Sequence, residues 1–309
     1  MTNAAAEEGV CSICGSAALS NIEGTLGGTY RACSICGYCE QALEGCGRPD
    51  RFEAEQRKHY EDDSLCSLAI YARLQAERAR RRIAAIQAHL PGGELLEVGP
   101  GNAETLLAVR QNGYTVTAVE HSSVLGERIS KEFDIPVHIG DFQTMWLPAE
   151  KYDGFLSFHV IEHVADPEAH LRKAAGLVRR GGFAFVATPN ARSWEHRISG
   201  RFSPNYSTAH LQLFTESSLC QLLKATGWTV VDIRTPSYVD AWLRVMTSFL
   251  RRCSAVVKPR EPSRRGLIGS SDLKTKLLID IARVLSAPGR YIQEKAMQGN
   301  EIMIVAERR

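Results

Sequence analysis

The sequence predicts an α/β fold: a Rossmann-like, mostly parallel sheet of seven strands, preceded by a small cysteine-rich domain. Two observations carry this prediction. From residue 94 onward, short apolar segments alternate with helical segments, which is typical of a parallel sheet covered on both faces. Before residue 50, the chain instead contains six of its nine cysteines and no long helical pattern. The two parts are therefore expected to form two different kinds of domain.

Seven apolar segments are expected to form the sheet: 94–98, 115–120, 136–140, 153–159, 183–188, 228–233 and 301–306. The helices between them have recognisable ends. Asp166 offers an N-cap, Pro167 follows at the first helical position, and Gly181-Gly182 is expected to end the same helix. Thr215 similarly caps the helix that precedes the sixth strand.

The expected domain organisation follows from these changes in pattern. Residues 1–50 form a zinc-binding ribbon, 51–90 a helical linker, and 91–309 the main domain with a helical insertion at about 236–299. The insertion breaks the strand–helix alternation, because about 65 residues separate the sixth strand from the seventh.

Composition excludes several classes of protein. The chain has 309 residues, of which 44% are apolar and 23% charged, so it is not disordered, collagen-like or a coiled coil. No apolar run approaches the roughly 18 residues of a membrane span, and the N-terminus lacks the pattern of a secretory signal. We therefore expect a cytoplasmic protein. A net charge of +2 argues against a dedicated nucleic-acid binder.

The cysteines at the N-terminus are arranged in pairs. Cys11-x2-Cys14 and Cys33-x2-Cys36 are separated by eighteen residues, which fits a spacing typical of zinc sites. Each pair can direct two thiolates toward one tetrahedral ion. Cys39 and Cys46 lie close by and leave the choice of the fourth ligand open, and an iron–sulfur centre is an alternative.

Residues at the strand ends suggest a ligand site. Ligands of open α/β sheets bind at the carboxyl ends of the strands. The first strand leads into Glu97-Val98-Gly99-Pro100-Gly101, where the glycines allow backbone to approach a ligand. A dinucleotide is disfavoured, because Glu104 occupies the third glycine position of GxGxxG, and an acidic residue ahead of the glycines suits an amino group. A purely structural glycine turn is the alternative.

Two further strand ends support a nucleoside-containing ligand. Glu120 ends the second strand and is placed to accept hydrogen bonds from a ribose diol. Asp141 and Phe142 follow the third strand, where a carboxylate beside an aromatic ring suits the amino group and face of adenine.

The segments ELLEVGPGNAETL, TAVEHS, GDF, YDGFLSFHVIEHVADPEAHL and HLQLFTESSLCQLLKATGW occur in this order. Over about residues 90–235 the chain thereby resembles class I S-adenosylmethionine-dependent methyltransferases. The resemblance implies that the cofactor is S-adenosylmethionine and that each motif contacts a different part of it. It departs from the family at the third glycine of the first motif, which is Ala103 here.

The implied cofactor contacts can be given by motif. Glu97, Gly99 and Gly101 would line the methionine part, and Glu120 would hold the ribose hydroxyls with His121 alongside. Adenine would lie between Asp141 and Phe142, and His159 would lie beneath the sulfonium. The residues implied by the resemblance are Glu97, Gly99, Gly101, Glu120, His121, Asp141, Phe142 and His159.

Catalysis requires positioning of the acceptor and removal of its proton. The candidate bases are His163, just past the fourth strand, and His210, in the loop before the Thr215 helix. A structural role for the turn at His163 is the alternative. Together with His159 and Glu162, these histidines resemble the divalent-metal cluster of small-RNA 2′-O-methyltransferases and ubiquinone O-methyltransferases, in which an acidic residue takes the place of His159.

The cysteine segment resembles the zinc ribbon of bacterial methyltransferases that act on sugars and polysaccharides, and also that of a ribosomal-RNA guanine methyltransferase family. The first resemblance implies methyl transfer to an oxygen, or alternatively a carbon, of a sugar, glycan or other small molecule. The second leaves an RNA methyltransferase open, although only Arg31 and Arg48 are basic before residue 50. A non-catalytic cofactor-binding scaffold is the third alternative.

The insertion contains a basic, partly apolar segment at residues 242–265. Seven lysines and arginines lie near Trp242, Met246 and Phe249, which is the composition of an interfacial amphipathic segment. Three interpretations of this segment stay open: peripheral contact with the inner face of the membrane, a solvated lid over the pocket, and a dimer contact.

Overall fold

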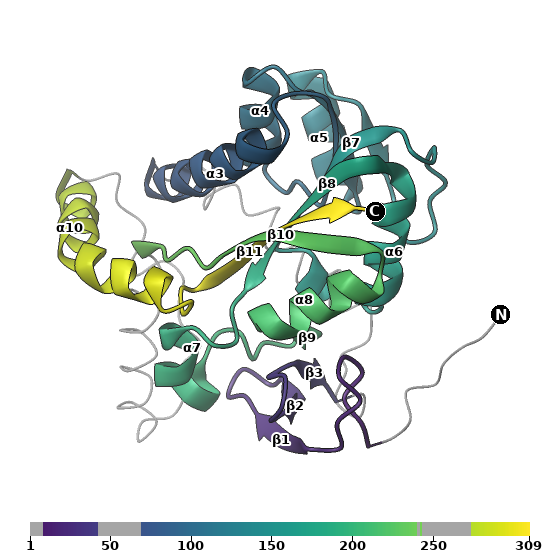
Figure 1. Cartoon of the computed structure of the whole chain (residues 1–309). Coiled ribbons are helices and arrows are strands. Elements are labelled where there is room, and N and C mark those ends of the chain that lie inside the picture. The colour runs from purple at the N-terminus through teal and green to yellow at the C-terminus, as the bar shows by residue number, and fades with distance from the viewer. Residues whose placement is uncertain (1–8, 43–68, 240–241, 243–272) are drawn as a thin grey trace.

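The computed structural model describes residues 9–42, 69–239, 242 and 273–309. Its main sheet has seven strands in the order β10-β11-β8-β7-β4-β5-β6 (Figure 1). Its strands are β4 (Glu94–Val98), β5 (Thr115–Glu120), β6 (Val137–Ile139), β7 (Tyr152–Phe158), β8 (Val178–Pro189), β10 (Trp228–Arg234) and β11 (Glu301–Arg308). Only β11 runs antiparallel to its neighbours in this sheet. The predicted Rossmann-like, mostly parallel sheet is confirmed.

Helices cover both faces of the sheet (Figure 1). The helices described are α3 (Ala69–His89), α4 (Glu104–Gln111), α5 (Ser123–Phe133), α6 (Pro167–Leu177), α7 (Trp194–Ser199), α8 (Glu216–Ala225) and α10 (Leu273–Lys295), with the 3-10 turns η2 (Ile161–His163) and η3 (Gly200–Phe202). Residues of α6 and α8 share one core cluster and those of α3, α4 and α5 another. Alternate residues of the buried strands enter the two clusters, for example Leu95 and Leu96, because successive strand side chains point to opposite faces.

The predicted start of α6 is confirmed, whereas the predicted stop is wrong. The Asp166 carboxylate accepts a hydrogen bond from the amide of Ala169 at 2.9 Å, and Pro167 opens the helix. The helix ends at Leu177 and β8 begins at Val178, so Gly181-Gly182 lies within a strand instead of ending the helix. The register between β7 and β8 shifts in this stretch, and glycine accommodates the irregularity.

The cysteine-rich segment forms a second, antiparallel sheet with the order β1-β2-β3-β9. Its strands are β1 (Leu19–Glu23), β2 (Thr29–Cys33), β3 (Cys39–Gln41) and β9 (Gln212–Leu213). Strand β9 comes from the main domain, directly before α8, so the two parts share a sheet (Figure 1). Because residues 43–68 lie outside the described part, the domain boundaries at 50 and 90 stay predictions.

The described part of the predicted insertion is chiefly α10. The basic segment 242–265 lies outside the described residues, except for Trp242. Within the part of the chain that the structure describes, every helix is too short or too polar to cross a bilayer.

Candidate active site at the carboxyl edge of the sheet

The carboxyl ends of β4, β5 and β7 lie side by side. These strands are parallel neighbours, with Glu97 paired to Ala118 of β5 and Leu156 of β7. Glu97 is therefore brought to the same edge as Glu120, which ends β5, and His159, which follows β7. This edge is where open α/β sheets bind their ligands.

Glu97 is a buried carboxylate with unused hydrogen-bonding capacity. Its side chain is 3% exposed, and its Oε2 atom has no hydrogen-bond partner among the described residues. Burial, reinforced by the nearby Glu104 and Glu120, raises its pKa to about 8 although Arg82 opposes this shift. A ligand ammonium would supply the missing partner and stabilise the charged carboxylate.

The loop after β4 has an unusual backbone. Gly99, Gly101 and Ala103 all have positive φ, at 66°, 56° and 63°. At Gly99 a Cβ atom would lie 2.7 Å from Cγ2 of Val160, so only glycine fits. Ala103 also adopts the left-handed conformation, which costs a residue other than glycine about 1 kcal/mol.

The Glu120 carboxylate lies against this loop, where the Gly101 amide donates to it. Its Oε1 atom accepts a hydrogen bond from the Ser122 amide at 2.9 Å. Burial raises its pKa, and the Ser122 and Gly101 amides oppose that shift by hydrogen bonding to the carboxylate. His121 is exposed next to it.

Asp141 and Phe142 have different surroundings. Asp141 is exposed, and its Oδ1 atom accepts a hydrogen bond from the Gln143 amide at 3.0 Å. Phe142 is 5% exposed, with its ring centroid 5.8 Å from that of Phe155 and 5.0 Å from that of His170. The phenyl ring thus belongs to the core, and Asp141 is the member of the pair that faces solvent.

His159 is held between two carboxylates. It has a φ of 58°, and its Nδ1 and Nε2 atoms lie 3.3 Å from Oε1 of Glu162 and 2.6 Å from Oε2 of Glu301. Burial lowers its pKa, but the hydrogen bonds to these carboxylates outweigh burial and raise it. Both ring nitrogens are therefore used within the protein.

Glu301 is a site residue that the sequence analysis missed. It is fully buried at the start of β11, and its carboxylate also contacts Arg82 at 3.3 Å and the Tyr238 hydroxyl at 3.2 Å. Since β11 runs antiparallel, its first residue lies at the edge where the parallel strands end. An acidic residue opening an otherwise apolar strand was the only signal for it.

Three side chains converge beside this network. A ligand atom from each of Glu162, His163 and His210 lies within 4.8 Å of the others. His163 Nδ1 is 2.7 Å from the Ala209 carbonyl oxygen and His210 Nδ1 is 3.0 Å from that of Asn205. Because a carbonyl only accepts hydrogen bonds, Nδ1 carries the proton in both rings and the lone pair of the neutral ring lies on Nε2.

The charge states of Glu162 and His210 suit a cation. Burial raises the pKa of Glu162, but the hydrogen bond from His159 and nearby histidines outweigh it and lower the pKa to about 2. Burial and the neighbouring His163 lower the pKa of His210 to about 4, so its ring is neutral at pH 7. One carboxylate and two imidazoles form a recurrent donor set for divalent transition metals. Here each imidazole donates a hydrogen bond to a backbone carbonyl, which orients the ring.

The four predicted cysteine ligands also come together. The Sγ atoms of Cys11, Cys14, Cys33 and Cys36 all lie within 4.8 Å of one another. The two Sγ atoms are 3.6 Å apart in the pair Cys11–Cys36 and also in the pair Cys14–Cys33. This distance is close to the edge length of a tetrahedron of sulfur atoms around zinc, with zinc–sulfur bonds of about 2.3 Å. Cys39 lies outside this cluster on β3, and Cys46 lies outside the described residues, so the cluster among the described cysteines is formed by the two CxxC pairs. The cluster fits a zinc ribbon.

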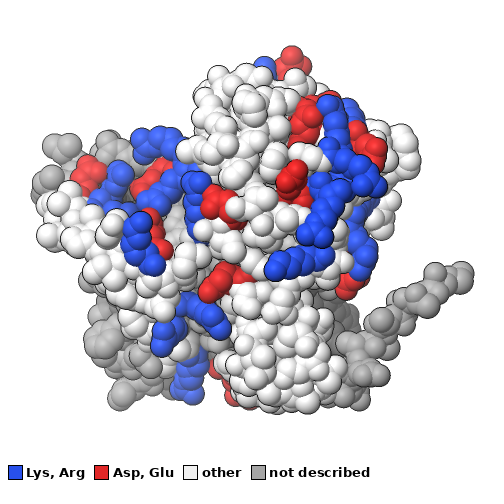
Figure 2. Space-filling model, viewed as in Figure 1, with Lys and Arg blue, Asp and Glu red and all other residues white. Residues whose placement is uncertain are grey.

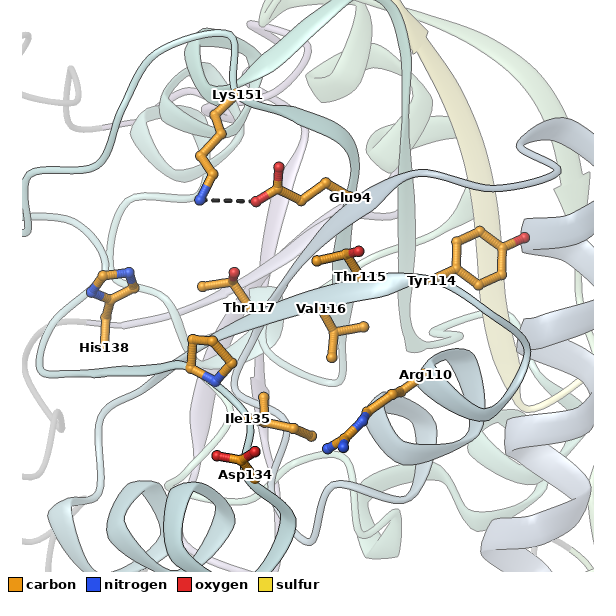
Figure 3. A pocket seen from close by; sticks show the side chains of 11 residues that line it. Glu94, Arg110, Tyr114, Thr115, Val116, Thr117, Asp134, Ile135, His138 and Lys151 are labelled. Atoms are coloured by element: carbon orange, nitrogen blue, oxygen red, sulfur yellow. Dashed lines mark ion pairs between the residues drawn. The ribbon is translucent and has the colours of Figure 1, made fainter.

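A pocket of about 450 Å³ lies elsewhere, at the amino ends of β4 and β5 (Figure 3). Glu94 and Lys151 form an ion pair of 2.8 Å on its wall, and Thr115 and His138 also line it. None of the predicted site residues lines this pocket. It is therefore separate from the carboxyl edge.

Comparisons with known proteins identify relatives of this chain. One relative is the ubiquinone biosynthesis O-methyltransferase of Coxiella burnetii. It is 25% identical over 159 residues, which cover 48% of this chain and 68% of that protein. The enzyme of the same name from Caulobacter vibrioides is 33% identical over 131 residues, which cover 40% of this chain and 52% of that protein.

Solved structures show the same fold. A SAM-dependent methyltransferase from Thermotoga maritima has a TM-score of 0.51 at 15% identity, covering 82% of this chain and 99% of that one. The 1,6-didemethyltoxoflavin-N1-methyltransferase of Burkholderia thailandensis has the same score and identity, covering 88% and 95%. The sequence profile of the methyltransferase domain matches residues 70–233, more than half of the chain. The chain therefore belongs to the methyltransferase domain family and is a SAM-dependent methyltransferase.

Proposed function

We propose that this enzyme transfers a methyl group from S-adenosylmethionine to a hydroxyl oxygen of a small molecule, sugar or glycan. We further propose that Glu162, His163 and His210 hold a divalent cation next to that oxygen. The convergence of these three side chains at the carboxyl edge carries the proposal. The relatives named for O-methyl transfer support oxygen over carbon as the acceptor atom.

The cofactor's methionine part fits the buried side of the edge. The unpartnered Oε2 of Glu97 would accept a hydrogen bond from the ammonium, and the backbone at Gly99 and Gly101 would lie against the chain. Glu120 would accept from the ribose hydroxyls, and Asp141 from the adenine amino group. The sulfonium supplies an already activated methyl group. His121 would lie beside the ribose. The His159 ring, held between the carboxylates of Glu162 and Glu301, would lie near the sulfonium.

At the acceptor side, the protein must hold a hydroxyl and remove its proton. A bound divalent cation would lower the pKa of an acceptor hydroxyl. His159 and Thr188 each contact one oxygen of Glu162, which fixes the orientation of its carboxylate. The imidazoles of His163 and His210, whose Nδ1 atoms donate to backbone carbonyls, are placed to hold the cation or to accept the proton through Nε2.

The donor set differs from that of the families with a similar cluster. They have an acidic residue at the position of His159, whereas both nitrogens of His159 contact carboxylates here. Three ligands, two of them imidazoles, favour a transition metal such as Mn²⁺ or Fe²⁺ over Mg²⁺.

We also propose that the four-cysteine cluster binds Zn²⁺ as a structural ion. Three buried thiols and one partly buried thiol at near-tetrahedral separation support this assignment. An RNA-gripping role for the ribbon is less well supported. Arg31 is the single basic residue of segment 9–42, and it pairs with Glu40 at 2.6 Å. Figure 2 likewise shows few charged side chains over the ribbon on the face displayed.

The test is methyl transfer from S-adenosylmethionine to a panel of aromatic and sugar hydroxyls, with Mn²⁺ added to metal-depleted enzyme. Glu162→Gln is expected to lower turnover at least about 100-fold while S-adenosylhomocysteine affinity stays within about twofold. Glu168→Gln, on the exposed surface of α6, is the control. Full activity of metal-depleted enzyme, or of Glu162→Gln, would overturn the metal assignment.

Peripheral membrane contact through residues 242–265 stays part of this proposal. The neighbouring helix α10 supports it, because Val284 and Leu285 are 72% and 76% exposed. Sedimentation with anionic lipid vesicles tests this contact, and equal recovery with and without vesicles would refute it.

A further inference from the structure

The ribbon and the segment that carries His210 are built as one structure. β9 completes the ribbon sheet by pairing with β3, where Cys39 faces Leu213. The amide of Gln41 also donates to the carbonyl of Leu211 at 2.8 Å. Figure 1 shows the ribbon below the main sheet, next to β9 and the start of α8. The residues between η3 and α8 therefore use the ribbon as their support.

Tyr30 of β2 makes the shortest side-chain contacts with this segment. It is fully buried, and its hydroxyl oxygen lies 2.6 Å from the carbonyl oxygen of His210 and 2.7 Å from that of Ser207. Its ring packs against Tyr206, with 5.2 Å between the ring centroids. The Nδ1 proton of His210 is donated to Asn205 in the same segment. Tyr30 thus fixes the backbone that sets the direction of the His210 ring.

Two glycines allow the hairpin between β1 and β2 to approach this closely. A Cβ atom on Gly24 would lie 2.3 Å from Cβ of Tyr206, and one on Gly28 would lie 2.6 Å from Cε2 of Tyr30. Neither glycine has a positive φ, so the backbone itself would accept alanine. At Gly24 the restriction comes mainly from Tyr206 of the His210 segment, and at Gly28 it comes from the Tyr30 ring and from the carbonyls of Tyr206 and Ser207.

The other side of the segment is bonded to the turn that carries Glu162 and His163. The Leu211 amide donates to the Glu162 carbonyl at 2.8 Å, and His163 Nδ1 donates to Ala209 at 2.7 Å. Gln212 links both sides, since its amide nitrogen donates to Val164 and its Oε1 accepts from the ribbon. The ribbon, the His210 segment and η2 are thus connected in series.

We propose that the ribbon is a structural part of the acceptor site and that Tyr30 is a positioning residue for His210. This inference rests on the proposed function, because it assigns the ribbon to the site formed by Glu162, His163 and His210. A ribbon that only stabilised the fold would not need a hydroxyl between two carbonyls of the segment that carries a site histidine.

Tyr30→Phe removes the hydroxyl and preserves the ring and its packing. The carbonyls of Ser207 and His210 lose a buried donor, so the segment relaxes and the His210 ring is no longer held toward Glu162. Loss of such an outer contact costs about tenfold in metal affinity. The cofactor residues lie on β4 and β5 of the main sheet, whereas Tyr30 belongs to the ribbon sheet, so cofactor affinity is expected to stay unchanged.

The experiment measures three quantities on the full-length enzyme: Mn²⁺ affinity by electron paramagnetic resonance, S-adenosylhomocysteine affinity by calorimetry, and amide hydrogen exchange of residues 205–213. Tyr114→Phe is the matched control, because its buried hydroxyl donates to the Leu90 carbonyl on the opposite side of the domain. Gly24→Ala is a second variant that acts on the same segment, with Gly92→Ala as its control, since no atom lies within 4 Å of a Cβ there.

Tyr30→Phe and Gly24→Ala are each expected to weaken Mn²⁺ binding about tenfold and to speed exchange in 205–213, with S-adenosylhomocysteine affinity near that of the controls. The melting temperature of Tyr30→Phe is expected near that of Tyr114→Phe, whereas the clash with Tyr206 lowers that of Gly24→Ala. Unchanged exchange and unchanged Mn²⁺ affinity in both variants would overturn the inference. If the wild-type enzyme binds no Mn²⁺, the metal assignment of the proposed function fails. The exchange data still decide whether Tyr30 holds the segment.

Discussion

Glu97→Gln tests the cofactor site through the pH dependence of binding. In the free protein the pKa of Glu97 is about 8, so the carboxyl group is mostly protonated at pH 7. An ammonium placed against Oε2 requires the charged carboxylate, so binding selects the deprotonated form. Affinity for S-adenosylhomocysteine should therefore rise with pH until the carboxylate is fully ionised.

The size of the pH effect on affinity follows from the fraction of free protein in which Glu97 is ionised. With a pKa of about 8, roughly one-tenth of the free protein is ionised at pH 7 and roughly one-hundredth at pH 6. The dissociation constant should change about tenfold per pH unit in this range. Binding at pH 7 should release about 0.9 proton. Glu97→Gln should remove this slope and weaken binding at pH 8 by about 10- to 100-fold, because a charged hydrogen bond is lost.

Isothermal titration calorimetry between pH 6 and 8, in buffers of different ionisation enthalpy, measures both the slope and the proton release. Glu94→Gln, at the opposite end of the same strand and paired with Lys151, is the control and should behave as the wild type. A dissociation constant independent of pH in the wild type would refute the reasoning. If the dissociation constant of Glu97→Gln kept its dependence on pH, the released proton would come from another group.

Three further predictions concern stability and metal content. Glu301→Gln should lower the free energy of unfolding by about 3–5 kcal/mol in urea melts, because the buried Arg82 guanidinium loses its paired carboxylate and the partly exposed His159 ring loses one of its two; a change below 1 kcal/mol would contradict this. Cys33→Ser should abolish the zinc measured by mass spectrometry in the wild type, and retention of one equivalent would disprove the four-thiolate assignment. Gly299→Ala should destabilise by about 1–3 kcal/mol, because its Cβ would lie 1.9 Å from the Thr235 carbonyl oxygen; Gly92→Ala, which meets nothing, should be near neutral.

The main sheet could be predicted from sequence because its signals are local. Each buried strand is a short apolar run between helices with clear caps, as at Asp166. The rule that ligands bind at carboxyl ends then brought Glu97 and Glu120 to one edge without knowledge of any contact. The cysteine cluster was predictable for a similar reason, since CxxC spacing restricts which thiols can share an ion.

Other features depend on contacts between distant residues. Glu301 joins the site because β11 is reversed, and the direction of a final strand cannot be read from its composition. Phe142 was expected to offer its ring to a ligand, yet the neighbouring Phe155 and His170 provide a core that covers it. The pairing of β9 with the ribbon involves only two residues, too few to show a strand pattern.

The shared sheet has a consequence for how such a protein can change in evolution. A ribbon acquired by gene fusion would ordinarily be exchangeable, because its linker carries the only connection. Here β9 lies inside the methyltransferase sequence but hydrogen-bonds to the ribbon. Removing or replacing residues 9–42 would expose a strand edge and the buried ring of Tyr206. The ribbon and the segment before α8 therefore form one unit of inheritance, and a chimaera that swaps one of them must swap both.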